Sequence, residues 1–208
     1  MLQSQLGLSG QSFDHYRIAL YTMDKTSRKL SESTISTHIE DVKTVIEHFR
    51  SKHSYKQIFL TAHSLSGLIA LILNPKGITA MSLWDPALDV TNCFKTNQSL
   101  TYIPERKQYY MTLGCAYVID ETMIEEIKNY PDEKCLELAG DISTPTQFII
   151  PEESIFLSSP HTSPENYRNA FAGDFDLQKI TNADHTFYYR GARQKLFDHT
   201  LRFFNTYQ

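Results

Sequence analysis

The stretch Tyr55–Leu73, YKQIFLTAHSLSGLIALIL, decides the fold of this chain. An apolar, β-prone run ends at Ala62, and a second apolar run follows Gly67. The polar residue Ser64 lies between the two runs, with small residues two positions before it and two after it. This pattern predicts a strand, a tight turn and a helix, with the serine side chain held outward at the turn.

We interpret Ser64 as a nucleophile. A strand-to-helix turn of this kind strains the backbone at the serine and tolerates only small neighbours, which explains the common G-x-S-x-G pattern. Here Ala62 and Ser66 replace the two glycines, so the strict pattern fails while its steric demand is met. The alternative is a serine that only caps the following helix. For a nucleophile, the backbone N–H of Leu65 is the first candidate donor to an oxyanion.

The composition narrows the class of protein. A chain of 208 residues with 41% hydrophobic content suits a single domain, residues 1–208, with a sizeable core. The net charge is -4 and the basic residues are scattered, so nucleic acid is not an expected partner. No apolar run is long enough to span a bilayer, and the start has no signal-peptide pattern. We therefore expect a cytoplasmic protein.

Cysteine and histidine spacing gives no sign of a bound metal. Cys93, Cys115 and Cys135 are widely spaced and odd in number, which disfavours both a disulfide framework and a zinc site. The eight histidines show no HxxxH or HxH spacing. We expect no metal and no cofactor.

Strand and helix patterns alternate along most of the chain. Predicted strands cover residues 16–24, 56–62, 78–84, 144–151 and 175–183, and predicted helices cover residues 35–51, 65–73 and 192–207. This alternation predicts an α/β fold with a mostly parallel sheet and helices on both faces. Residues 88–143 are less regular, with a hairpin pattern at 99–114 and a short helix at 121–130. We expect this segment to form a small lid within the domain.

The end of the chain supplies a histidine downstream of the serine. His185 lies in ADHTF, between the last predicted strand and the closing helix. This arrangement resembles the end of an α/β-hydrolase, particularly of the serine aminopeptidase-like and cinnamoyl or feruloyl esterase-like branch. The resemblance implies that His185 takes the proton from Ser64 and gives it to the leaving alcohol. A surface-loop histidine is the alternative for His185, and His161 is a second candidate base. His63 is expected to shape the turn and to point away from the site, because neighbours along a strand alternate in direction.

The resemblance extends from Tyr16 to the end of the chain, with a changed front. The stretch from Tyr21 to Ile46 is similar to the family's yD.rG.G.S loop and following helix, without the glycines of that loop. Few residues precede the first predicted strand, so we expect a fold shortened at its N-terminus. The HG motif that normally supplies a second oxyanion donor is missing, and Gly7–Gly10 is the candidate replacement.

The position of the acid departs from most of the family. There the acid follows the strand before the histidine, and Ser154 falls at that position here. Glu152 or Glu153 could substitute if the loop shifts. Asp85 follows an earlier strand in MSLWDPAL, which resembles the LDPA stretch of pancreatic-type lipases. Because parallel strands end at one edge of a sheet, either carboxylate could reach the same histidine. We favour Asp85, and a turn-forming Asp-Pro is its structural alternative.

Together these features predict a serine hydrolase that cleaves a small carboxylic ester through an acyl-enzyme. The tyrosines of the insertion either contact the substrate or pack the lid onto the core; they are Tyr102, Tyr109, Tyr110 and Tyr117. The same triad would also serve a thioesterase, an amidase or an acyltransferase. A catalytically inactive hydrolase-fold binding protein is the alternative from a different class.

Overall fold

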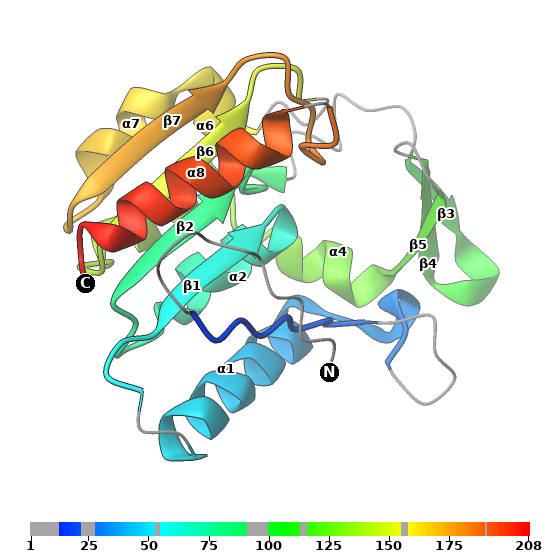
Figure 1. Ribbon diagram of the computed structural model, residues 1–208. Coiled ribbons are helices and arrows are strands. Elements are labelled where there is room, and N and C mark those ends of the chain that lie inside the picture. Colours follow the sequence, from blue (N-terminus) through cyan, green and yellow to red (C-terminus); the bar gives the residue numbers. More distant parts are fainter. Residues whose placement is uncertain are drawn as a thin grey trace.

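The computed structural model describes residues 13–21, 28–52, 55–90, 100–112, 116–154, 158–189 and 191–208. Its centre is a parallel sheet of four strands in the order β1-β2-β6-β7 (Figure 1). The strands are β1 (Phe59–His63), β2 (Ala80–Trp84), β6 (Thr146–Pro151) and β7 (Phe175–Ile180). His63 pairs with Trp84, and Trp84 pairs with Ile149. The residues that follow β1 and β2 therefore leave the sheet side by side.

Helices cover both faces of this sheet. On one face lie α1 (Ile35–Lys52), α2 (Leu65–Leu73), α5 (Asp132–Gly140) and α7 (Pro164–Ala170). The closing helix α8 (Ala192–Asn205) packs on the other face, against β2, β6 and β7 (Figure 1). A parallel sheet with helices on both faces was predicted, and it is confirmed. No helix among the described residues is long and apolar enough to cross a membrane.

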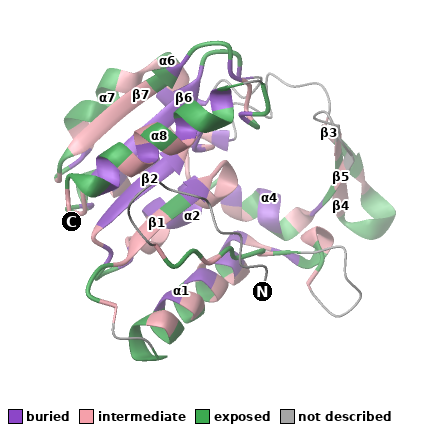
Figure 2. Cartoon of the chain, in the orientation of Figure 1, coloured by how far each residue is buried: buried purple, intermediate pink, exposed green. Residues whose placement is uncertain are grey.

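The alternating side chains of the strands build one core on each face. Phe148 packs in the large core beside α2, and the next residue, Ile149, packs with Leu196 of α8. Figure 2 shows this burial along β2 and β6, the two central strands. Trp84 also donates its indole N–H to Thr200 Oγ1 of α8, at 3.0 Å. The sheet is thus buried on both faces, as parallel sheets require.

The predicted insertion contains a separate antiparallel sheet. It consists of β3 (Leu100–Ile103), β4 (Gln108–Thr112) and β5 (Ala116–Asp120), with the 3-10 turn η2 (Pro104–Arg106) between the first two strands. The hairpin and the short helix, α4 (Glu121–Ile127), confirm the sequence pattern, whereas β5 and α5 were not expected. The sheet lies beyond α4, away from the parallel sheet (Figure 1).

Hydrogen bonds and apolar packing tie the insertion to the rest of the chain. Glu126 of α4 accepts hydrogen bonds from the backbone N–H and the hydroxyl of Ser36, at 3.1 and 2.6 Å. Tyr109 and Tyr117 pack against the main core, as the packing alternative expects. Tyr102 and Tyr110 are instead 39% and 38% exposed.

The first predicted strand is not formed by the residues that the structure describes. Residues 16–21 of the expected strand 16–24 pair with no strand of the described residues, and residues 22–24 lie outside the described residues. The side chains explain this difference. Tyr16 packs on Phe49 of α1, with ring centroids 4.1 Å apart, while Ile18 is 37% exposed. The segment follows the surface of a helix, with the 3-10 turn η1 (Leu30–Glu32) before α1.

A buried histidine in α1 makes stability sensitive to acid. His38 is 2% exposed, stacks beside Tyr21, and has no hydrogen-bond partner for either ring nitrogen among the described residues. Burial lowers the pKa of His38, and the nearby Asp41 carboxylate opposes this effect. The unfolded chain therefore binds a proton more readily than the folded chain does.

Replacing His38 by Phe should remove this sensitivity. Because wild-type stability is lost as the pH falls through about 6.5, the ordinary histidine pKa, the His38→Phe variant should gain most below that pH. We expect a gain of about 1 kcal/mol at pH 7, since two unpaired buried nitrogens disappear, and a larger gain at pH 5.5. Urea unfolding at both pH values measures this difference. His48→Phe, at an exposed position of the same helix, is the control, and equal pH dependence of all three proteins would contradict the interpretation.

Candidate active site

Ser64 occupies a strained turn between β1 and α2. Its backbone angles are φ 58° and ψ −127°, which a residue with a side chain rarely adopts. Its N–H donates to the carbonyl of Trp84 at 3.0 Å, and its own carbonyl accepts from Gly67 and Ala87 at 2.8 and 3.0 Å. The Ser64 side chain makes no capping bond to α2. The helix-cap alternative is therefore not what the structure shows, and the turn holds the serine as a nucleophile would require.

Gly67 is a crowded position at this turn. A Cβ atom at this position would lie 2.6 Å from Cβ of Pro86, in the loop after β2. The sequence interpretation placed the steric demand at Ala62 and Ser66, two positions before and two after Ser64. The structure adds Gly67, the third residue after the serine, which the loop after β2 approaches. This close approach brings the ends of β1 and β2 together.

His185 lies in a short loop that is held by buried neighbours and by hydrogen bonds to Asp184. Ala183 and Phe187 on either side of it are buried, at 0% and 1% exposure. Between them, Asp184 accepts hydrogen bonds from the N–H groups of Thr186 and Tyr188, at 3.2 and 3.1 Å. This is the local turn chemistry that aspartate favours. These hydrogen bonds fasten the loop that the sequence ADHTF forms.

His63 supports the same loop from β1. Its Nε2–H donates to the backbone carbonyl of His185 at 2.7 Å, and the two rings lie 4.7 Å apart. Burial lowers the pKa of His63, and the neighbouring His185 lowers it further, so the neutral ring is favoured. The expectation that His63 points away from the site is therefore wrong.

Asp85 receives hydrogen bonds from three side chains. His185 Nδ1 lies 2.6 Å from Oδ2, and the Ser154 hydroxyl donates to the same oxygen at 2.7 Å. His161 Nε2 lies 2.5 Å from Oδ1. The carboxylate is 1% exposed, and its backbone N–H extends the β2–β6 ladder by donating to Ile149 at 2.8 Å. The structure thus brings together the candidate base and the favoured candidate acid.

The electrostatics of Asp85 favour its charged form. Burial alone raises the pKa of a carboxylic acid, but the hydrogen bonds from His161 and His185 outweigh that effect. The pKa of Asp85 is therefore lower than its ordinary value. A charged carboxylate on Nδ1 of His185 sets the tautomer in which Nε2 can accept a proton.

The alternative acids lie elsewhere. Glu152 and Glu153 are exposed, and their backbone N–H groups extend the sheet by donating to Ile180 and Ala183. The Glu152 side chain accepts from the N–H of Asn182 at 3.4 Å. Within the described residues, no hydrogen bond joins either glutamate to His185. Ser154, at the position where most of the family has its acid, contacts Asp85 instead.

The alternative base, His161, faces the acid with the wrong nitrogen. A triad base binds its acid through Nδ1, as His185 does, and keeps Nε2 for the nucleophile and the substrate. His161 contacts Asp85 through Nε2. It lies in the four-residue helix α6 (Ser159–Thr162). No sequence pattern indicated that a second histidine would reach Asp85, because His161 and Asp85 lie 76 residues apart.

The oxyanion site is described only in part. Leu65 is the first residue of α2, so its N–H is one of the amides that have no partner within the helix. It follows Ser64 directly, as the sequence interpretation requires. The other candidate, Gly7–Gly10, lies outside the described residues. Among the described residues, no group of three or more His, Cys, Asp or Glu side chains is arranged to hold a metal ion.

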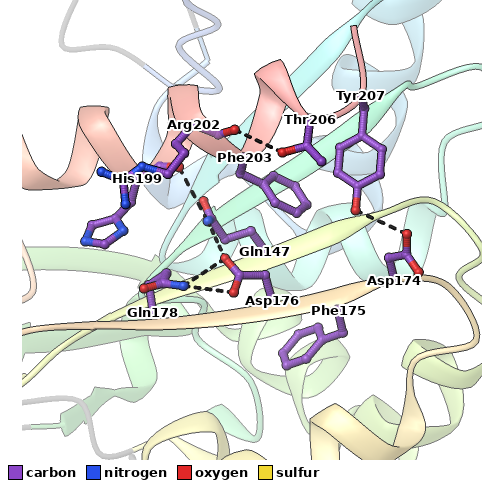
Figure 3. A pocket seen from close by; sticks show the side chains of 10 residues that line it. All are labelled: Gln147, Asp174, Phe175, Asp176, Gln178, His199, Arg202, Phe203, Thr206 and Tyr207. Atoms are coloured by element: carbon purple, nitrogen blue, oxygen red, sulfur yellow. Dashed lines mark hydrogen bonds between the residues drawn. The ribbon is translucent and has the colours of Figure 1, made fainter.

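A pocket of about 310 Å³ lies away from these residues, between α8 and the strands β6 and β7 (Figure 3). Gln147 donates to Asp176 at 2.7 Å inside it, and Tyr207 donates to Asp174 at 3.2 Å. Gln147 is near the start of β6, whereas Ser154 follows the end of that strand. The pocket is therefore separate from the Ser64–His185–Asp85 site.

Solved structures of other proteins share the architecture of this chain. No protein-family model and no curated protein matches the sequence. The structure is similar to Est1E from Butyrivibrio proteoclasticus, solved with ferulic acid bound (TM-score 0.70, 12% identity), over 88% of this chain and 72% of that one. It is also similar to α/β-hydrolase domain-containing protein 10 from mouse (TM-score 0.63, 14% identity), over 90% of this chain and 76% of that one.

A third similar structure is a monoacylglycerol lipase from Paleococcus ferrophilus, with a TM-score of 0.58 and 12% identity. The match covers 85% of this chain and 78% of the lipase. At these identities the comparison establishes the architecture and no activity. The chain has the α/β-hydrolase fold, as the sequence resemblance implied.

The strained backbone at Ser64 gives a prediction about stability. Glycine adopts a positive φ without the steric cost that a Cβ imposes. We expect Ser64→Gly to be more stable than Ser64→Ala by about 1 kcal/mol, because both variants lack the hydroxyl and only alanine keeps the strain. Urea unfolding of the two variants measures the difference. Equal stability would show that the turn stores no strain at this residue.

Proposed function

We propose that this protein is a serine hydrolase that cleaves a small carboxylic ester through an acyl-enzyme. The observation that carries the proposal is the hydrogen bond between His185 Nδ1 and the buried Asp85 carboxylate, at the strand ends where the turn presents Ser64. The similar structures include an esterase domain and a monoacylglycerol lipase, which supports this reaction class. The segment 88–143 is proposed as a lid that borders the acyl or alcohol pocket.

The reaction begins with attack by Ser64 Oγ on the ester carbonyl carbon. His185 Nε2 takes the hydroxyl proton, and the negative charge of Asp85 stabilises the imidazolium that forms. The N–H of Leu65 donates to the oxyanion of the tetrahedral intermediate. When the intermediate collapses, the bond to the alcohol oxygen breaks, and His185 returns its proton to that oxygen. Ser64 is left as an acyl ester.

Water completes the cycle by the same route. His185 takes a proton from the water as its oxygen attacks the acyl carbon, and a second tetrahedral intermediate forms. Collapse of this intermediate breaks the bond to Ser64 Oγ, which regains its proton from His185. The carboxylic acid leaves, and the protein returns to its starting state.

The first test is hydrolysis of p-nitrophenyl acetate and butyrate by the wild type and three variants. Ser64→Ala should lose at least about 10³-fold in kcat, because the nucleophile is gone. Asp85→Asn should lose about 10³- to 10⁴-fold, because an amide can hold His185 in the wrong tautomer. Asparagine suits this position because, like aspartate, it tolerates the φ of 41° found there.

Glu153→Gln makes the same change from acid to amide at an exposed position, and it should keep wild-type activity. Labelling of the wild type by a fluorophosphonate, with none of Ser64→Ala, would show an activated serine. A wild type that neither hydrolyses the esters nor becomes labelled would overturn the proposal. The chain would then be a hydrolase-fold protein without this chemistry.

Exchanging residues 85 and 154 tests the placement of the acid. The Ser154 hydroxyl and His185 Nδ1 both contact Oδ2 of Asp85, so a carboxylate on residue 154 would lie within reach of the same histidine. We expect Asp85→Ser to be nearly inactive and Asp85→Ser/Ser154→Asp to recover at least about tenfold in kcat. Steady-state kinetics of both variants measure this. No recovery in a folded double variant would mean that only the loop after β2 can supply the acid.

A further inference from the structure

A second histidine is part of the Asp85 environment and has no role in the mechanism above. The carboxylate has two oxygens and can accept about four hydrogen bonds. One oxygen accepts from His185 and Ser154, and the other accepts from His161 at 2.5 Å. The side chain of His161 is 9% exposed, so its contact with the carboxylate is shielded from water. Each oxygen of the acid thus has an imidazole donor.

We propose that His161 is a positioning residue: its Nε2–H holds Oδ1 of Asp85 so that the charged Oδ2 faces His185. This inference rests on the proposed function, because it assigns a role within the same triad. Without a donor on Oδ1, the carboxylate could rotate about its Cβ–Cγ bond and turn away from His185. The donor also stabilises the anion in a site from which water is excluded.

The surroundings of His161 fit this role. Ser158, at the start of α6, donates its hydroxyl to the carbonyl of Pro86 at 3.2 Å, directly beside Asp85. Ser159 is hydrogen bonded to Tyr167 of α7 at 2.8 Å, and Tyr167 donates to Asp132 of α5 at 2.8 Å. The short helix is therefore fastened both to the acid loop and to the helical layer. A donor on such a support keeps its direction during catalysis.

His161 contributes through the direction of its N–H bond. It satisfies one oxygen of Asp85, and the other oxygen remains directed at the imidazolium of His185. The charge of Asp85 matters most when His185 carries the proton, which is in the transition states of both acyl-transfer steps. Loss of His161 should accordingly lower kcat and leave KM nearly unchanged.

The experiment compares His161→Phe with His161→Gln. Phenylalanine keeps the planar shape without a donor, and the side-chain amide of glutamine can place an N–H near the position of Nε2. We expect His161→Phe to lose about 10- to 100-fold in kcat, as is typical when a hydrogen bond to a charged group is removed. We expect His161→Gln to recover most of that loss. His48→Phe, the same change at an exposed histidine, should behave as the wild type.

Proton NMR provides a readout that does not need turnover. Two ring N–H protons on one buried carboxylate, from His161 and His185, should resonate far downfield of the other imidazole protons. His161→Phe should remove one of these signals and shift the other, while His48→Phe should change neither. If the wild type is inactive and unlabelled by fluorophosphonate, the proposed function fails, yet these signals still test whether His161 holds Asp85.

Three outcomes would overturn the inference. One is a kcat for His161→Phe within about twofold of the wild type. Another is equal loss in the folded Phe and Gln variants together with a raised KM, which would indicate a packing role only. The third is a single downfield proton in the wild type that persists unchanged in His161→Phe.

Discussion

The hydrogen bonds to the buried carboxylate of Asp85 are the interactions on which the rest of the site depends. It lies at the end of β2, between the loop that carries Ser64 and the segment that follows β6. Hydrogen bonds from His185, Ser154 and His161 converge on it from three separate parts of the chain. A buried charge of this kind is costly unless it is fully paired, so these segments must reach their places for the fold to be stable.

Backbone strain and a close backbone contact are both found near Asp85. Ser64 and Asp85, which follow neighbouring strands, both have positive φ angles of 58° and 41°. Pro86 lies so close to Gly67 that a side chain there would overlap it. Backbone strain of this kind persists only where the surrounding structure enforces it, and it commonly marks functional sites. Here the register of β1, β2 and β6 supplies the enforcement, since each loop is held by a ladder hydrogen bond to the next strand.

The position of Asp85 differs from the position at which the sequence resemblance would place an acid. Most hydrolases that the sequence resembles place the acid after the strand that precedes the histidine, and this chain has Ser154 there. In the structure the Ser154 hydroxyl donates to the carboxylate of Asp85, which follows the neighbouring strand. Two adjacent strand ends thus contribute a charged oxygen and a hydroxyl donor beside His185.

The sequence by itself determined the local elements, because strand and helix periodicity, turn residues and small side chains are properties of neighbouring residues. It predicted the strand, turn and helix around Ser64, the parallel sheet, the closing helix and the loop of His185. It failed for residues 16–21, where the apolar side chains follow a helix surface and not a sheet. Only the tertiary structure decided that Asp85, not Glu152 or Glu153, meets His185, and that Ser154, His161 and His63 support the pair. Those contacts join residues 69 to 122 positions apart, and their geometry depends on strand register and loop packing, which no short stretch of sequence encodes.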